Sequence, residues 1–66
     1  MDDIEWLNTT QAAERLGLTP GTLYKFINSG SLPGYRFGRV IRIKRSDIDQ
    51  FIESARIQPG DLGLEY

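Results

Sequence analysis

The chain has 66 residues, of which 39% are hydrophobic and 26% are charged, and its net charge is -1. A chain this short forms one small domain without a deep core or an enclosed substrate pocket. It contains no Cys and no His, which excludes the common zinc sites, thiol nucleophiles, Ser-His-Asp triads and disulfide frameworks. We therefore predict that it is no enzyme and has no cofactor or metal. The lack of disulfides favours the cytoplasm, and no apolar run is long enough for a membrane partner.

The charges are unevenly distributed along the chain. Between Arg15 and Asp47 there are seven basic residues and no carboxylate, and the acidic residues lie toward both ends. This segregation predicts one positive face on a molecule that is nearly neutral as a whole. The basic block consists of Arg15, Lys25, Arg36, Arg39, Arg42, Lys44 and Arg45.

The first elements are a short apolar stretch and a helix. Residues 4–7 could form a strand or an extended arm. Asn8 is a suitable N-cap, and Gln11 stands where it can complete a capping box. Gly17 is placed to end the helix in a left-handed cap. The pattern predicts a helix over residues 9–16.

A second helix follows after a very short connection. Thr19 is a good cap, Pro20 suits the first helical position, and Gly30 is placed to close the helix. Its apolar stripe consists of Leu23, Phe26 and Ile27. Two helices joined by such a turn match the helix-turn-helix unit, with an ordinary helical hairpin as the alternative.

From Leu32 onward apolar and basic residues alternate, which predicts two strands and a turn at Gly38. A two-residue loop would pair Phe37 with Val40 and place Ile41 beside Arg36. A three-residue loop pairs Phe37 with Ile41 and Tyr35 with Ile43. We favour the three-residue loop, because it separates the apolar side chains from Arg36 and Arg42.

The last predicted helix starts after Ser46, which we expect to be its cap with Asp49 completing the box. Its inward residues are expected to be Ile48, Phe51 and Ile52. The fold class is thus mainly α with a small β-hairpin, and the domain is expected to cover residues 1–55. Residues 56–66 form a tail with apolar Leu62, Leu64 and Tyr66, which either frays or docks on this domain or a neighbouring copy.

The outer face of the second helix is a candidate nucleic-acid surface. Asn28 can pair with adenine, Lys25 can bind guanine or a phosphate, and Gly21 allows close approach of the backbone. The helix N-terminus can accept a phosphate. Thr22 and Tyr24 flank this face. A merely solvated helix face is the alternative.

The hairpin carries three arginines without an acidic partner: Arg39 at the turn, flanked across the strands by Arg36 and Arg42. Like charges placed together repel unless a polyanion compensates them, so we expect Arg39 to contact a phosphate or the minor groove. Lys44 and Arg45 precede a helix N-terminus, where positive charge is unfavourable, and this also suggests phosphate contacts. For Arg42 the alternative is a scaffold salt bridge with Asp47, Asp49 or Glu14.

The motifs together resemble a known family. Residues 7–19 read LNTTQAAERLGLT, residues 22–24 TLY, residues 29–33 SGSLP, residues 36–39 RFGR, residues 42–43 RI and residues 45–48 RSDI. This order resembles excisionase-type, MerR-like DNA-binding domains over roughly residues 5–53. The resemblance implies a winged helix-turn-helix with three short helices and a two-stranded wing over residues 36–42. Its reading helix would enter the major groove with Pro20, Gly21, Thr22, Tyr24, Lys25 and Asn28.

The resemblance also implies a function. Family members include phage and plasmid excisionases and small bacterial transcription regulators, some of which bind DNA as cooperative arrays. We therefore expect sequence-specific binding of double-stranded DNA by a bacterial or phage-encoded, nucleoid-associated protein. Further copies or an integrase-type protein are the expected partners, and no small-molecule effector is expected, because the chain has no long dimerisation helix and no effector domain. The alternative is a protein-interaction module whose basic face meets an acidic partner, with Tyr24, Tyr35 and Phe37 as anchors.

Overall fold

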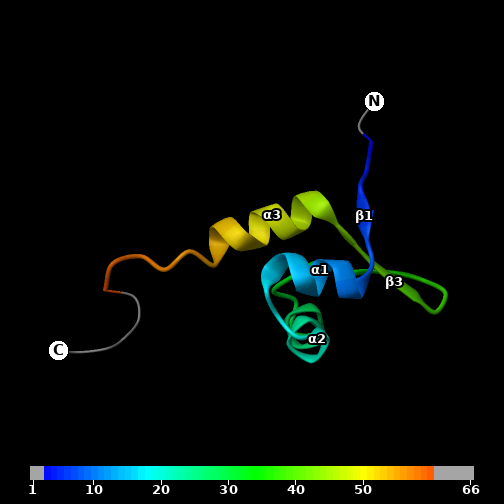
Figure 1. Cartoon of the computed structure of the whole chain (residues 1–66), viewed down its shortest axis with the longest axis horizontal. Helices are drawn as coiled ribbons and strands as arrows, with labels where there is room; N and C mark the ends of the chain where they lie inside the picture. Colours follow the sequence, from blue (N-terminus) through cyan, green and yellow to red (C-terminus); the bar gives the residue numbers. More distant parts are fainter. Residues whose placement is uncertain (1–2, 61–66) are drawn as a thin grey trace.

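The computed structural model describes residues 3–60 as three helices around a small antiparallel sheet (Figure 1). The elements in chain order are β1 (Trp6–Leu7), α1 (Thr9–Leu16), α2 (Pro20–Asn28), β2 (Tyr35–Phe37), β3 (Val40–Lys44) and α3 (Arg45–Ser54). The winged helix-turn-helix class is confirmed, and β1 adds a strand to the two of the wing. None of the helices within residues 3–60 has the length and apolar character that a membrane span requires. The prediction for Leu62, Leu64 and Tyr66 lies outside the described residues.

The caps of the first two helices agree with the sequence. The N–H of Gln11 donates to Asn8 Oδ1 at 2.7 Å, and the N–H of Asn8 donates to Gln11 Oε1 at 3.0 Å. Gly17 ends α1 with φ +69°, a conformation that costs glycine little. The N–H of Thr22 donates to Thr19 Oγ1 at 3.3 Å at the start of α2. Both helices therefore begin where local side-chain bonds satisfy free backbone N–H groups.

The stretch before α1 forms a strand rather than a free arm. The sheet order is β1-β3-β2, and Trp6 and Leu7 pair with Lys44 and Ile43 of β3. Beyond the strand, the N–H of Arg45 donates to the carbonyl of Glu5 at 2.9 Å. The N-terminal segment is thus bonded to the far end of the hairpin.

The predicted three-residue loop of the hairpin is wrong. The loop consists of Gly38 and Arg39 alone, and the opposed pairs are Phe37 with Val40, Arg36 with Ile41, and Tyr35 with Arg42. Gly38 has φ +67°, whereas no non-glycine residue among residues 3–60 has a positive φ. This combination fits a type II′ turn, whose twist suits a two-residue hairpin.

The hairpin does not adopt the other register because its apolar side chains do not share one face. Trp6 lies edge-to-face against Tyr35 at 5.2 Å and against Phe37 at 5.4 Å between ring centroids. The two aromatic residues therefore pack on one side of the sheet, while Ile43 is buried on the other. Arg36 lies on the side of Ile41, and Arg42 lies on the side of Tyr35.

The predicted cap of the last helix is also wrong. Helix α3 begins at Arg45, its N-cap is Lys44, and no side chain caps it. Because the Arg45 N–H is already bonded within the sheet, β3 passes into the helix without a loop. Ile48 is buried and Phe51 is half-buried as expected, but Ile52 is 43% exposed.

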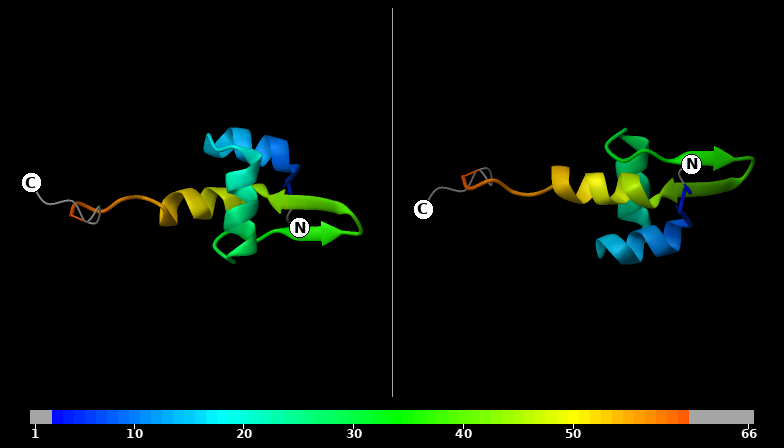
Figure 2. Two further views of the ribbon diagram at one scale, coloured as in Figure 1. Left: turned by 90° about the horizontal axis from the view of Figure 1, so that it is seen from below. Right: turned by 90° about the horizontal axis from the view of Figure 1, so that it is seen from above.

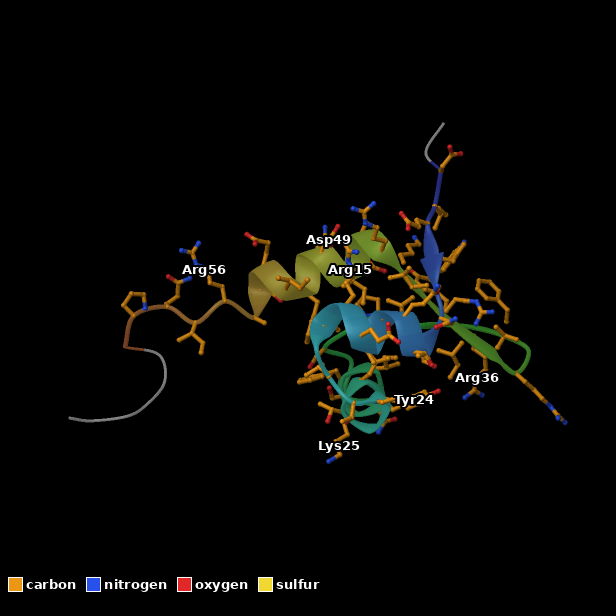
Figure 3. All side chains as sticks on the ribbon, in the orientation of Figure 1. Arg15, Tyr24, Lys25, Arg36, Asp49 and Arg56 are labelled. Atoms are coloured by element: carbon orange, nitrogen blue, oxygen red, sulfur yellow. The ribbon has the colours of Figure 1, made fainter. Side chains whose placement is uncertain are left out.

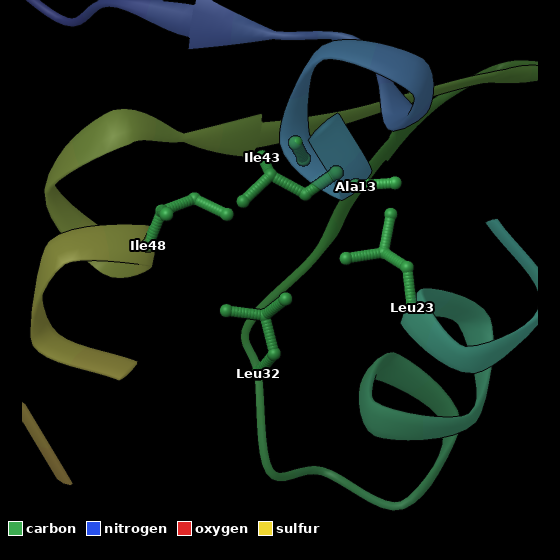
Figure 4. Packing of buried hydrophobic residues seen from close by; sticks show 6 residues of the cluster. Ala13, Leu23, Leu32, Ile43 and Ile48 are labelled. Atoms are coloured by element: carbon green, nitrogen blue, oxygen red, sulfur yellow. The ribbon is translucent and has the colours of Figure 1, made fainter. Parts of the chain in front are cut away.

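The core lies where the three helices meet β3, and α1 packs against both α2 and β3 (Figure 4). The ring of Phe26 packs against that of Phe51, with centroids 5.1 Å apart. A Cβ atom at Gly34 would lie 2.9 Å from Ile27 Cγ2, so the loop before β2 runs close against α2. The positions of α2 and the wing are therefore set by one shared core. Its fully buried residues are Ala12, Ala13, Leu23, Leu32, Ile43 and Ile48.

Candidate nucleic-acid interface

Helix α2 buries one side and presents the other to solvent. Leu23 is fully buried, whereas five of the six predicted reading residues are exposed: Pro20, Gly21, Tyr24, Lys25 and Asn28. The sixth, Thr22, is half-buried and its Oγ1 accepts from Thr19 Oγ1 at 3.1 Å. In the left view of Figure 2, α2 crosses in front, with the hairpin reaching out to one side and α3 to the other. This arrangement leaves the exposed side of α2 open to a long partner.

Tyr24 links the two helices of the helix-turn-helix at their outer surface. The Tyr24 hydroxyl donates to Thr9 Oγ1 at 3.5 Å, a long hydrogen bond, and the residue as a whole is 43% exposed. This contact places Thr9, the first residue of α1, beside the predicted reading residues. Sequence reasoning missed Thr9, because a contact across 15 positions leaves no periodic signal.

Gly21 has no structural reason to be glycine inside this domain. It lies in the first turn of α2, its φ is not positive, and a Cβ atom there would meet nothing within 4 Å. Glycine in a helix is less favourable than alanine by about 1 kcal/mol. The position therefore suits an approach by another molecule rather than internal packing.

One wing arginine joins the surface of α2. Arg36 lies on the face of the hairpin that carries Ile41 and, further along, the buried Ile43. In Figure 3 the side chains of Arg36, Tyr24 and Lys25 all lie on the lower side of the molecule. Arg39 occupies the two-residue loop at the tip of the same hairpin and is exposed. Arg36 thus lies on the same side of the molecule as Tyr24 and Lys25 of α2, and Arg39 lies at the wing tip.

The next two predicted wing residues leave from the opposite face. Arg42 opposes Tyr35, and its Nη1 donates to the carbonyl of Ile41 at 3.0 Å. Lys44 Nζ lies 5.0 Å from the ring centroid of Tyr35, a cation–π contact. The suggested salt bridges from Arg42 to Asp47, Asp49 or Glu14 are not among those formed by residues 3–60.

The remaining predicted phosphate contact, Arg45, is held by acidic residues. Its Nη1 lies 3.1 Å from Glu5 Oε1, and its Nε lies 3.9 Å from Asp49 Oδ2. Arg15 Nη2 also approaches Asp49, at 3.6 Å from Oδ1. Figure 3 shows Arg15 and Asp49 on the upper side, away from Lys25 and Arg36. Arg45 therefore lies with Arg15, Glu5 and Asp49 on a side where both signs of charge occur, which we call the mixed-charge side.

The ion pairs of the folded molecule lie away from the side that carries Lys25 and Arg36. Every ion pair found within residues 3–60 involves Arg15 or Arg45, whereas Lys25, Arg36 and Arg39 have no carboxylate within salt-bridge distance. Exposed cations without acidic neighbours keep a positive local potential that attracts polyanions. Within the same residues, no three His, Cys, Asp or Glu side chains gather as a metal site.

Family comparison agrees with this geometry. A family model described as a helix-turn-helix domain matches residues 6–56. This range includes every helix and strand that the structure describes. No curated protein and no solved structure gives a significant match. Membership in such a family supports DNA as a partner, and its domains are typically non-enzymatic. The chain belongs to the helix-turn-helix domain family, in its excisionase-like form.

Proposed function

We propose that this protein binds specific sequences of double-stranded DNA as a small transcription regulator or a recombination accessory factor. The observation that carries the proposal is the sorting of charge: Lys25 and Arg36 share one side, and the ion pairs of Arg15 and Arg45 lie away from it. Residues 1–55 would form the binding domain and residues 56–66 an appended segment.

In the proposed complex, α2 enters the major groove and the wing follows the backbone toward the next minor groove. Lys25 and Asn28 are placed to reach base edges, because both are exposed on the side of α2 opposite Leu23. Gly21 would let the first turn approach the backbone, where helix N–H groups favour a phosphate. Arg36 and Arg39 would hold phosphates or the minor groove. Arg42, Lys44 and Arg45 would contribute less, since they face elsewhere.

The small size of the domain favours binding by several copies. A single module of this kind buries about 600–1,000 Å² of protein surface on DNA, which limits how well one copy selects a site. We therefore propose cooperative binding of further copies, or a partner such as an integrase. A neighbouring integrase gene would favour the recombination role over the regulatory one. Either role would place the protein with the nucleoid of a bacterial or phage-infected cell.

A salt titration with a matched pair of variants tests DNA binding. For about four to six phosphate contacts, the log-log slope of affinity against salt is about -4 to -5. Arg36→Ala should weaken binding to all duplexes and reduce the size of the slope. Arg56→Ala removes the same charge from an exposed position beyond the end of α3 and should change neither quantity. A wild-type slope near zero would exclude the proposed mode.

A selection from random duplexes tests the assignment of the reading helix. Lys25→Ala and Asn28→Ala should each change the preferred site, since base contacts determine specificity. Gly21→Ala has room in the fold and should lower affinity without lowering stability. Unchanged site preference in both the Lys25 and Asn28 variants would show that another surface reads the sequence.

The protein-interaction alternative has less structural support. Its proposed anchors do not form one surface: Tyr24 lies on α2 beside Thr9, whereas Tyr35 and Phe37 pack with Trp6 on the other side of the sheet. Heparin retention together with a gel shift on mixed duplex DNA separates the two functions. Retention of an acidic protein without any gel shift would favour the alternative.

A further inference from the structure

An apolar groove lies where the ends of α1 and α3 approach α2, with a volume of about 530 Å³. Phe26, which lines it, packs against the core, whereas Lys25 and Asn28 are exposed on the outer side of α2. The proposed DNA contacts therefore leave this groove unused. Its lining residues are Leu16, Leu18, Phe26, Ser31, Phe51, Ile52, Ser54 and Ala55.

Two exposed isoleucines accompany the chain as it leaves the groove. Ile52 lines the groove and is 43% exposed, and Ile57, just beyond α3, is 59% exposed. The chain then turns at Pro59 and Gly60, and Gly60 has φ +92°. Proline followed by glycine with a positive φ fits the centre of a type II turn. A chain that reverses at this point returns toward the end of α3.

The residues that follow the turn have a two-sided pattern, Asp-Leu-Gly-Leu-Glu-Tyr. In an extended conformation, Leu62, Leu64 and Tyr66 point to one side, and Asp61 and Glu65 point to the other. Such a segment can cover an apolar surface while both carboxylates stay in water. It needs no cation in the groove, and the lining of the groove contains none.

The length of the segment also selects this groove. The steps from Ala55 to Gly60 cover at most about 18 Å, and six extended residues span about 20 Å. Counted outward from a two-residue turn, Leu62 returns beside Ile57 and Leu64 returns beside Ala55. The hairpin, with its exposed aromatic residues, lies at the opposite end of the 48 Å long axis (Figure 1) and is out of reach.

We propose that residues 61–66 fold back at this turn and cover the groove of their own chain, with Leu64 and Tyr66 against Ala55 and Ile52. Because the segment is tethered by a short connection, its effective concentration at this groove is about millimolar, which favours it over a neighbouring copy. The contact closes the side on which the three helices meet. It goes beyond the proposed function and is testable without DNA, so its outcome is independent of whether the protein binds a duplex.

Two full-length variants of the same segment provide the test, with thermal denaturation followed by circular dichroism. The inward variant, Leu64→Ser with Tyr66→Ser, should lower the melting temperature by about 4–8 °C. The outward variant, Asp61→Ser with Glu65→Ser, is the matched control and should leave the melting temperature nearly unchanged. No loss in the inward variant, or equal losses in both variants, would overturn the proposal.

A substitution in the groove gives a second measurement. Ile52→Ser changes a residue that is already 43% exposed, so the domain should stay folded, as a dispersed NMR spectrum can establish. In this background, Leu64→Ser with Tyr66→Ser should lower the melting temperature by less than half as much as in the wild type, because groups in contact are energetically coupled. Equal losses in the two backgrounds would mean that the segment does not bind this groove.

NMR of the full-length wild type locates the contact directly. We expect nuclear Overhauser effects between the methyl groups of Leu64 and the ring of Phe51. Signals of Ser31 and Ala55 should differ between the wild type and the inward variant by the same amount at every protein concentration. Three results would overturn the proposal: random-coil shifts throughout residues 61–66, differences centred on Trp6, or differences that grow with concentration. The last result would mean that the segment binds a neighbouring copy.

Discussion

The two faces of the sheet differ in both packing and charge. The inner face buries Ile43 completely against the helices and carries Arg36 toward its outer end, on the same side of the molecule as Tyr24 and Lys25. The outer face holds Trp6 against Tyr35 and leaves Phe37 more than half exposed. Each face thus combines apolar residues with cations, but only the inner one is closed by the domain itself.

This difference separates two tasks within a very small molecule. A residue on the inner face contributes to the core or to the surface shared with α2. A residue on the outer face stabilises the wing through aromatic contacts and remains accessible. Neighbouring positions on one strand therefore have unlike roles, and single substitutions can distinguish them.

The largest expected effect comes from removing a core side chain of the inner face. Ile43→Ala should lower the free energy of unfolding by about 2–5 kcal/mol, because it leaves a cavity among well-packed residues. Val40→Ala, on the outer side of the same strand, should cost less than about 1 kcal/mol. Urea denaturation followed by circular dichroism measures both. Equal losses would mean that the outer face is as tightly packed as the inner one.

An intermediate effect is expected from the aromatic centre of the outer face. Trp6→Ala removes two edge-to-face contacts, each contributing about 0.5–1.5 kcal/mol beyond simple burial. The unfolding free energy should fall by at least about 1 kcal/mol, because these contacts are lost together with the burial of the half-buried ring, and thermal denaturation measures the loss. Binding of the folded variant to a single DNA site should stay the same. A lost DNA contact without lost stability would place Trp6 in the nucleic-acid surface.

A smaller effect, on the free energy of DNA binding, is expected from the arginines of the two faces. Because the two substitutions remove the same charge, they compare the faces directly. Arg36→Ala should weaken DNA binding about tenfold, or about 1.4 kcal/mol, and reduce the salt slope by about 0.9. Arg42→Ala removes the same charge from the other face and should have a clearly weaker effect. Fluorescence anisotropy with a labelled duplex at several salt concentrations measures both. Equal losses would mean that DNA contacts both sides of the wing.

The smallest effect is expected on the mixed-charge side of the molecule. Arg45→Ala breaks ion pairs with Glu5 and Asp49, whose side chains are about half exposed. Exposed pairs contribute about 0–1 kcal/mol, so the melting temperature should change little and even less at high salt. The loss of DNA affinity should be smaller than for Arg36→Ala. A loss of DNA affinity larger than that of Arg36→Ala would mean that Arg45 contacts a phosphate.

The sequence predicted those features of the fold that depend on nearby residues. The capping box of Asn8 and Gln11 and the left-handed Gly17 involve residues within one or two turns of the same helix, and all three were correctly placed. The fold class could be predicted because these local signals occur in a specific order along the chain.

The errors arose where residues distant in sequence decide the structure. The loop of the hairpin depends on Trp6, which gives Tyr35 and Phe37 a separate face, and the start of α3 depends on the carbonyl of Glu5. Neither contact has a periodic signature in the sequence.

The candidate site was predictable on the helix but not on the wing. The exposed side of α2 follows from the helical period once Leu23 is known to be buried. On a strand, a change of one residue in the loop moves a side chain to the other face. Arg36 and Arg42 could therefore not be assigned to opposite faces before the loop was known.

The direct passage of β3 into α3 has a consequence for the DNA. With the Arg45 N–H bonded to Glu5 and no loop at the junction, the protein has no hinge between the wing and α3. The shared core likewise fixes α2 relative to β3 through α1, which packs against both. If the groove spacing does not match this rigid shape, the duplex must bend to meet it. Sites containing flexible TA or CA/TG steps should then be favoured even where no side chain reads those bases.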